Sequence, residues 1–184
     1  MGGSHGRTDR IDILEDLSLC EITLCTVCSH SCLDKSWKQG IGEDSMFKKL
    51  LVATDGSEQA LRACREAAGM AKAFGSEVTL IYVVYLPPMY KTDVGPGIRE
   101  TLVDDGKEIL QKSKEEADAS GIEAKVKLIR EGNPAEVIVK ESKSGAYDLI
   151  VMGSSGLGRA GALQLGSVSV RVAHDADCSV LIIK

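Results

Sequence analysis

The 184-residue chain contains no apolar run of about 18 residues, so no segment is typical of a membrane-spanning helix. It also lacks a basic excess: 22 lysines and arginines stand against 27 aspartates and glutamates, a net charge of −5. We therefore expect no nucleic-acid partner, because no basic face would attract phosphates. The N-terminus lacks a basic start followed by an apolar stretch. We accordingly expect no signal peptide, a cytoplasmic location and reduced cysteine thiols.

The first 45 residues differ in composition from the rest, with four basic and eight acidic residues. Four of the six cysteines lie here: Cys20, Cys25, Cys28 and Cys32. We interpret residues 1–45 as a Cys-rich N-terminal extension, either peripheral to function or a non-native start, and residues 46–184 as the domain. A zinc or iron–sulfur site is an alternative for the cysteines, but no second, distant cysteine pair follows. We expect free thiols and no metal site.

Strand and helix patterns alternate along residues 46–184. Short apolar runs predict strands at 50–53, 78–84, 124–129, 149–152 and 180–183. Apolar residues spaced by about 3.6 positions predict helices at 60–74 and from 98 to Gly121, and two more helices begin after Asn133 and Gly166. This order implies an α/β fold, an open parallel five-stranded sheet with helices on both faces. Ligands of such sheets bind beyond the carboxyl ends of the strands.

A glycine-rich loop follows the fourth predicted strand, with the spacing Gly153-x2-Gly156-x9-Gly166-Ser167. Glycines let the backbone approach a ligand closely, and the first amides of the helix that opens at Ser167 have no partner within that helix. Such a helix start binds phosphate, and Arg159 would add a positive charge. We predict a phosphate site here; a Gly/Ser-rich surface loop is the alternative.

The loop is neither of two common nucleotide motifs. No Gly-Lys-Ser/Thr follows, so it is not a Walker A loop, and its glycines do not follow the first strand as in the dinucleotide fingerprint. Residues 46–184 instead resemble the universal stress protein family. The resemblance rests on residues 51–57, 82–84, 132–135, 148–153 and 174–183 and on the glycine-rich loop. The ATP-binding branch of that family is similar in having G-x2-G-x9-G-S/T.

The resemblance implies a Rossmann-like, adenine-nucleotide α-hydrolase-like sheet with strand order 3-2-1-4-5. It also implies ATP as ligand, with Mg²⁺ or Mn²⁺ carried by the phosphates. Asp55 and Val83 would contact the adenosine half, and residues of the glycine-rich loop would hold ribose and phosphates. The candidate site is Ala53, Thr54, Asp55, Val83, Met152, Gly153, Ser155, Gly156, Arg159, Gly166, Ser167 and Val168. Two departures, Ala53 and Ser179 where the family often has proline, lie outside the phosphate motif.

These features favour a nucleotide-responsive stress or signalling protein without catalytic residues. A slow ATP hydrolase or phosphotransfer enzyme is the alternative, although the loop has no lysine and no Walker-type aspartate for phosphoryl transfer. A third possibility is an interaction protein with an empty site. We also expect a homodimer, because the apolar C-terminal strand would lie at a sheet edge and could pair with its own copy.

Overall fold

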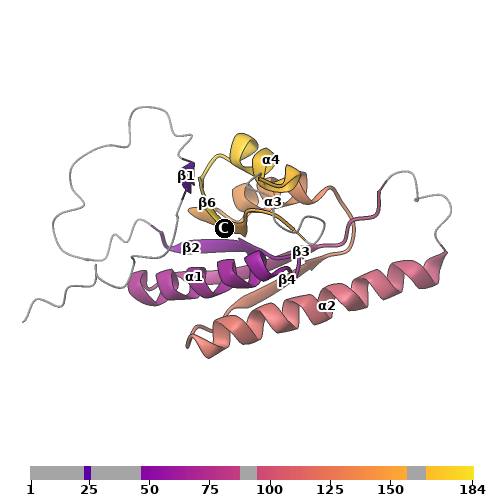
Figure 1. Ribbon diagram of the computed structural model, residues 1–184, viewed down its shortest axis with the longest axis horizontal. Coiled ribbons are helices and arrows are strands. Elements are labelled where there is room, and N and C mark those ends of the chain that lie inside the picture. The colour runs from indigo at the N-terminus through magenta and orange to yellow at the C-terminus, as the bar shows by residue number, and fades with distance from the viewer. Residues whose placement is uncertain (1–22, 26–46, 88–94, 157–164) are drawn as a thin grey trace, which may run out of the picture.

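The computed structural model describes residues 23–25, 47–87, 95–156 and 165–184. Its sheet has the order β1-β6-β5-β2-β3-β4 (Figure 1). Five strands are parallel: β2 (Lys49–Ala53), β3 (Glu77–Val83), β4 (Lys125–Ile129), β5 (Leu149–Gly153) and β6 (Ser179–Ile183). Counted among themselves, these five have the order 3-2-1-4-5, which confirms the prediction.

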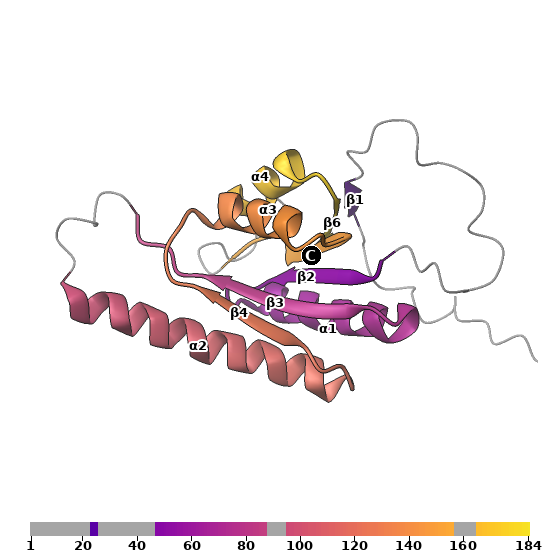
Figure 2. The same cartoon turned by 180° about the vertical axis from the view of Figure 1, so that it is seen from behind.

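Helices cover both faces of this sheet. They are α1 (Glu58–Phe74), α2 (Pro96–Ala119), α3 (Pro134–Ser144) and α4 (Ser167–Asp175). Figures 1 and 2 show α1 and α2 together on one face and α3 and α4 on the other. Helix α2 begins at Pro96, inside the segment expected to be a loop, because proline suits the first turn of a helix. None of the described helices combines the length and apolar composition needed to cross a membrane.

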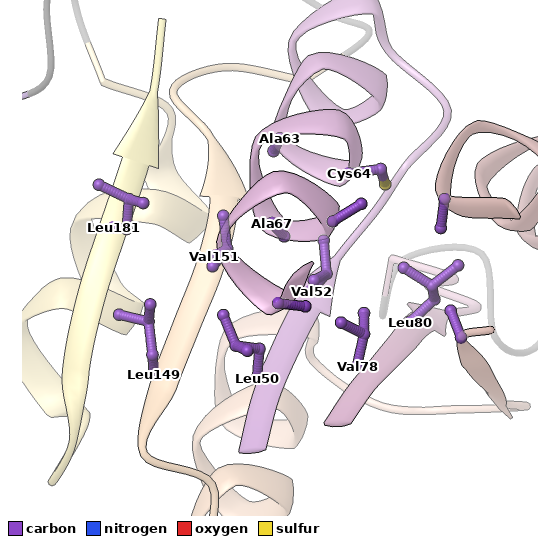
Figure 3. Packing of buried hydrophobic residues seen from close by; sticks show 14 of the residues in the cluster. Leu50, Val52, Ala63, Cys64, Ala67, Val78, Leu80, Leu149, Val151 and Leu181 are labelled. Carbon is purple, nitrogen blue, oxygen red and sulfur yellow. The ribbon is translucent and has the colours of Figure 1, made fainter. Parts of the chain in front are cut away.

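Alternating side chains of the strands build two apolar layers. Leu50 and Val52 point toward α1 and α2, whereas Leu51 points toward α3 and α4, and all three are fully buried. Figure 3 shows the first layer, where Ala63 and Ala67 lie on the side of α1 that packs against the strands. These small side chains let the helix approach closely, and each buried leucine contributes about 2 kcal/mol. The strand ends are therefore held in a fixed arrangement.

The sheet has a sixth strand that the sequence patterns did not predict. β1 (Thr23–Cys25) comes from the N-terminal extension and pairs antiparallel with β6, with Leu24 opposite Leu181. The expectation that the C-terminal strand lies at a free edge is therefore wrong for the described structure. The extension also contributes to the sheet, which the interpretation of residues 1–45 as separate from the domain did not anticipate. Cys20, Cys28 and Cys32 lie outside the described residues.

Candidate functional site

A cavity of about 410 Å³ opens at the carboxyl ends of β2, β3 and β5. That volume suits a small-molecule ligand, and the position is the one that open parallel sheets use for binding. Eleven of the twelve predicted site residues line it: Ala53, Thr54, Asp55, Val83, Met152, Gly153, Ser155, Gly156, Gly166, Ser167 and Val168. The twelfth, Arg159, lies outside the described residues.

The turn after β2 brings a carboxylate to this cavity. Ser57 is the N-cap of α1, and its Oγ accepts a hydrogen bond from the Ala60 amide at 3.2 Å. Asp55 Oδ1 accepts from the Ser57 amide at 3.0 Å, so Asp55 orders the turn while Ser57 caps the helix. Gly56, between them, has φ +79°, a conformation that favours glycine. Asp55 is the one acidic or basic residue among the described residues that line the cavity.

The end of β3 presents backbone groups to the same cavity. The bonding between β2 and β3 ends where the Thr54 amide donates to the Ile81 carbonyl at 3.0 Å. Val83 lies two residues further, so its amide and carbonyl point to that same side, where β2 has already ended. On the opposite side, the Val84 amide donates to the Ile129 carbonyl at 2.8 Å. The donor and acceptor of Val83 therefore face the cavity.

The three motif glycines meet different surroundings. A Cβ on Gly153 would lie 3.0 Å from the Ala60 nitrogen, so this glycine allows α1 to pack against β5. A Cβ on Gly156 would collide with Oδ2 of Asp55, which places the glycine loop against the turn after β2. Among the described residues, a Cβ on Gly166 would meet nothing closer than 3.4 Å. Packing against the described residues therefore does not explain Gly166, which lines the cavity.

The N-terminus of α4 borders this space. Its N-cap is Gly166, which offers no capping side chain. The Gly166 amide donates to the Ser154 carbonyl at 2.7 Å, and Ser169 Oγ donates to the Gly153 carbonyl at 2.9 Å. These bonds fasten the start of α4 to the end of β5. The first-turn amides beside Ser167 and Val168, which line the cavity, are left for an acceptor from outside the helix.

Two tyrosines from β3 and its end also line the cavity, and the sequence analysis did not predict them. Burial raises the pKa of the Tyr82 phenol, and the carboxylates of Asp55 and Asp105 add to the shift. Tyr85 is 45% exposed at the rim. The other lining residues that were missed are Ala60, Ile81, Pro134, Ile138 and Ser169. Pro134 could have been predicted, because it begins the helix that follows the third parallel strand, and that helix start lies at the same sheet edge as the cavity.

No group of three metal-ligating side chains occurs among the described residues. The described residues that line the cavity include a single carboxylate, Asp55, which is too few ligands for a protein-bound Mg²⁺ site. A divalent ion at this site would take most of its ligands from phosphates and water.

Comparison with known proteins points to one family. The model of the universal stress protein family matches residues 46–184. A universal stress protein of Methanocaldococcus jannaschii is 37% identical over 144 residues, 77% of this chain and 84% of that protein. One from Thermus aquaticus is 36% identical over 140 residues, 76% of this chain and 100% of the relative.

Solved structures share the fold and hold nucleotides. A universal stress protein in complex with cAMP aligns with a TM-score of 0.61 and 26% identity, covering 76% of this chain and 99% of that chain. A universal stress protein from Archaeoglobus fulgidus in complex with dAMP aligns with a TM-score of 0.59 and 25% identity, with the same two coverages.

Proposed function

This chain belongs to the universal stress protein family, and on that premise we propose that it binds ATP in the cavity at the ends of β2, β3 and β5. Binding would make it a nucleotide-responsive stress or signalling protein. The observation that carries the proposal is the start of α4: a helix N-terminus without a capping side chain borders a cavity beside Gly166. Phosphate groups suit that position, because the amides donate hydrogen bonds and the helix dipole favours negative charge.

The opposite end of the cavity suits adenine. The Val83 carbonyl would accept from the exocyclic amino group, and the Val83 amide would donate to the neighbouring ring nitrogen. Asp55 would accept hydrogen bonds from ribose hydroxyls between the two ends. The two structural relatives reported above hold cAMP and dAMP, which are both adenine nucleotides. The choice of ATP over a nucleoside monophosphate rests on the complete spacing of Gly153, Gly156, Gly166 and Ser167.

Calorimetry with ATP, AMP and GTP, each with Mg²⁺, tests this assignment. ATP should bind at least tenfold more tightly than GTP, because guanine presents an acceptor and a donor where adenine presents a donor and an acceptor. AMP should bind more weakly than ATP, because it lacks the outer phosphates. Absence of ATP binding at millimolar concentration would contradict the proposal, and equal affinities for ATP and GTP would contradict the role of Val83.

We propose a binding rather than a catalytic role for the nucleotide. Fast phosphoryl transfer needs charge clamps and a residue that orients the nucleophile. The described lining offers one carboxylate, Asp55, which is used in the turn after β2. We expect ATP turnover below about one per minute, whereas a rate near 1 per second would indicate an enzyme. We also propose that the protein is cytoplasmic and that it forms a homodimer through β6.

A further inference from the structure

A buried polar cluster interrupts the apolar layer between the sheet, α1 and α2. Its members are Thr54 at the end of β2, Cys64 on α1 and Ser113 on α2, with exposed fractions of 6%, 1% and 0%. Thr54 Oγ1 and Ser113 Oγ lie 2.8 Å apart and share a hydrogen bond. Burial raises the pKa of the Cys64 thiol, and the nearby hydroxyls of Ser113 and Thr54 oppose that rise. Polar groups from three elements thus lie together in the interior, and the two hydroxyls satisfy each other.

The cluster connects α2 to the cavity through the turn after β2. Thr54 lines the cavity, and its Oγ1 also accepts from the Gly56 amide at 3.3 Å. That bond spans Asp55, the carboxylate expected to meet the ribose. Helix α2 touches this turn a second time, since a Cβ on Gly56 would lie 3.0 Å from Cγ1 of Ile109. Ser113 and Ile109, one turn apart on α2, therefore support the turn from behind.

The two supports differ in what they constrain. Ile109 restricts where the turn can lie, whereas the Ser113 hydroxyl restricts how the Thr54 hydroxyl is oriented. A hydroxyl has one donor and two acceptor positions. With Ser113 in place, Thr54 is held between Ser113 and the Gly56 amide. Without it, the Thr54 hydroxyl loses one of these two partners and is free to rotate about the Cα–Cβ bond, which takes the acceptor away from the Gly56 amide.

We propose that Ser113 is a positioning residue of the nucleotide site, acting through Thr54 and the Gly56 amide on the Asp55 carboxylate. The inference rests on the proposed function and extends it to a residue that does not line the cavity. It predicts that removing one hydroxyl behind the site weakens nucleotide binding. It also predicts that the loss acts through the mobility of the turn after β2.

The test compares Ser113→Ala with Ser142→Ala in the full chain. Ser142 is also buried in a helix, at 3% exposed, but its hydroxyl donates to the Val139 carbonyl of its own helix and it does not line the cavity. Both variants lose a buried hydroxyl and should lower Tm. Ser113→Ala alone should raise the Kd for ATP about threefold to tenfold, the effect of losing one hydrogen bond in the chain of contacts. Its Gly56 amide should also exchange with deuterium faster, measured by NMR.

A double variant tests whether Ser113 acts through the Thr54 hydroxyl. In a Thr54→Val background, Ser113→Ala should have no further effect on Kd, because the contact is already gone. An unchanged Kd and unchanged Gly56 exchange in folded Ser113→Ala would overturn the inference, as would an additive loss in the double variant. If Ser113→Ala does not fold, a Thr54→Val variant with normal Gly56 exchange overturns it as well. Failure of the wild type to bind ATP would refute the proposed function instead, while Gly56 exchange still reports on the positioning.

Discussion

Gly166 and Gly95 have nearly the same backbone conformation but different surroundings. Both are N-caps, with φ −66°, ψ 156° at the start of α4 and φ −63°, ψ 163° at the start of α2. Any residue can adopt these angles. Gly166 lines the cavity beside the first amides of α4, whereas Gly95 does not line it, and no described residue lies within 4 Å of a Cβ added there. Substitutions at Gly166 and Gly95 can therefore separate an effect on ligand binding from an effect on the backbone at a helix start.

We expect Gly166→Val to reduce ATP affinity by more than 100-fold and to leave the fold intact. The valine methyl groups would extend into the space proposed for phosphate, and the added Cβ itself meets no described residue closer than 3.4 Å. Gly95→Val, the matched control, should bind ATP like the wild type. Calorimetry gives the affinities, and circular dichroism checks the fold. Wild-type affinity in folded Gly166→Val would show that the glycine-rich loop is only a surface turn.

Cys64 predicts a loss of stability at alkaline pH. Burial raises the pKa of its thiol from the ordinary 9.0 to about 11. The unfolded chain therefore loses this proton at a lower pH than the folded chain does. The contribution of the thiol is fully present below pH 9 and is lost as pH rises from 9 to 11, by about 2–3 kcal/mol. In urea unfolding, the difference in free energy between wild type and Cys64→Ala should shrink over that range; a difference independent of pH would contradict it.

At the scale of single elements, α3 connects a helix cap to the cavity. Asn133 Oδ1 accepts from the Ala135 amide at 3.1 Å and the Glu136 amide at 3.4 Å, which confirms Asn133 as the predicted N-cap. Pro134 and Ile138, in the first two turns, line the cavity. Loosening this cap should therefore affect both the helix and the wall of the site.

Asn133→Ala should lower the free energy of unfolding by about 1 kcal/mol, because two amides at the start of α3 lose their acceptor. Asn133→Asp should retain most of that stability, since a carboxylate caps equally well. Urea unfolding of the three proteins measures the effect. Equal losses in both variants would mean that the amide nitrogen of Asn133, rather than its oxygen, supports the helix.

The sequence predicted the elements well because their signals are local. The alternation of buried runs and helical spacing needs only neighbouring residues, and it gave all five parallel strands and four helices. The candidate site was predictable for a related reason: residues that follow parallel strands meet at one sheet edge, which unites Asp55, Val83 and Gly153 in the cavity. The resemblance to a family supplied the strand order and the choice among those residues.

The features that the sequence did not predict depend on contacts between residues that are distant in sequence. Thr54 and Ser113 are 59 positions apart, and nothing in a serine within a charged helix indicates that it will be buried against a strand end. Tyr82 lies in a strand whose apolar run predicts core, and its ring packs against α2, where a Cβ on Gly106 would lie 2.7 Å from Cε1 of Tyr82. Its place in the cavity lining follows from the packed fold and not from its neighbours in sequence. β1 has only three residues, too few for a recognisable period.

For the whole molecule, β1 changes what the C-terminal strand can do. In the described structure β1 pairs with β6 on the side that a second copy would need. The pairing joins three residues, so it contributes only a few hydrogen bonds at about 1 kcal/mol each. β6 itself has four buried apolar residues. A second β6 that pairs with its outer edge would extend the sheet across a two-fold axis. The extension and a second copy therefore compete for one edge.

We predict that a chain beginning at Met46 folds, binds ATP with unchanged affinity, and forms a homodimer through β6. The five parallel strands and all described residues of the cavity lie after that start. The full chain should dimerise more weakly, because β1 must first leave the edge of each copy. Light scattering of both proteins at tens of micromolar, with calorimetry for ATP, measures these outcomes. A shortened chain that is insoluble, or that stays monomeric, would contradict the prediction.

A proline shows whether the dimer uses this edge. The Ser154 amide donates to the Ile183 carbonyl, so the backbone groups of Ile183 and of Leu181, two residues earlier, face β5. Val180 and Ile182 then present their amides to the outer edge. Val180→Pro in the shortened chain should remove an edge donor and return the protein to a monomer that still binds ATP. Leu181→Pro would instead damage the pairing of β6 with β5 and lower stability. A folded Val180→Pro protein that remains fully dimeric would place the interface elsewhere.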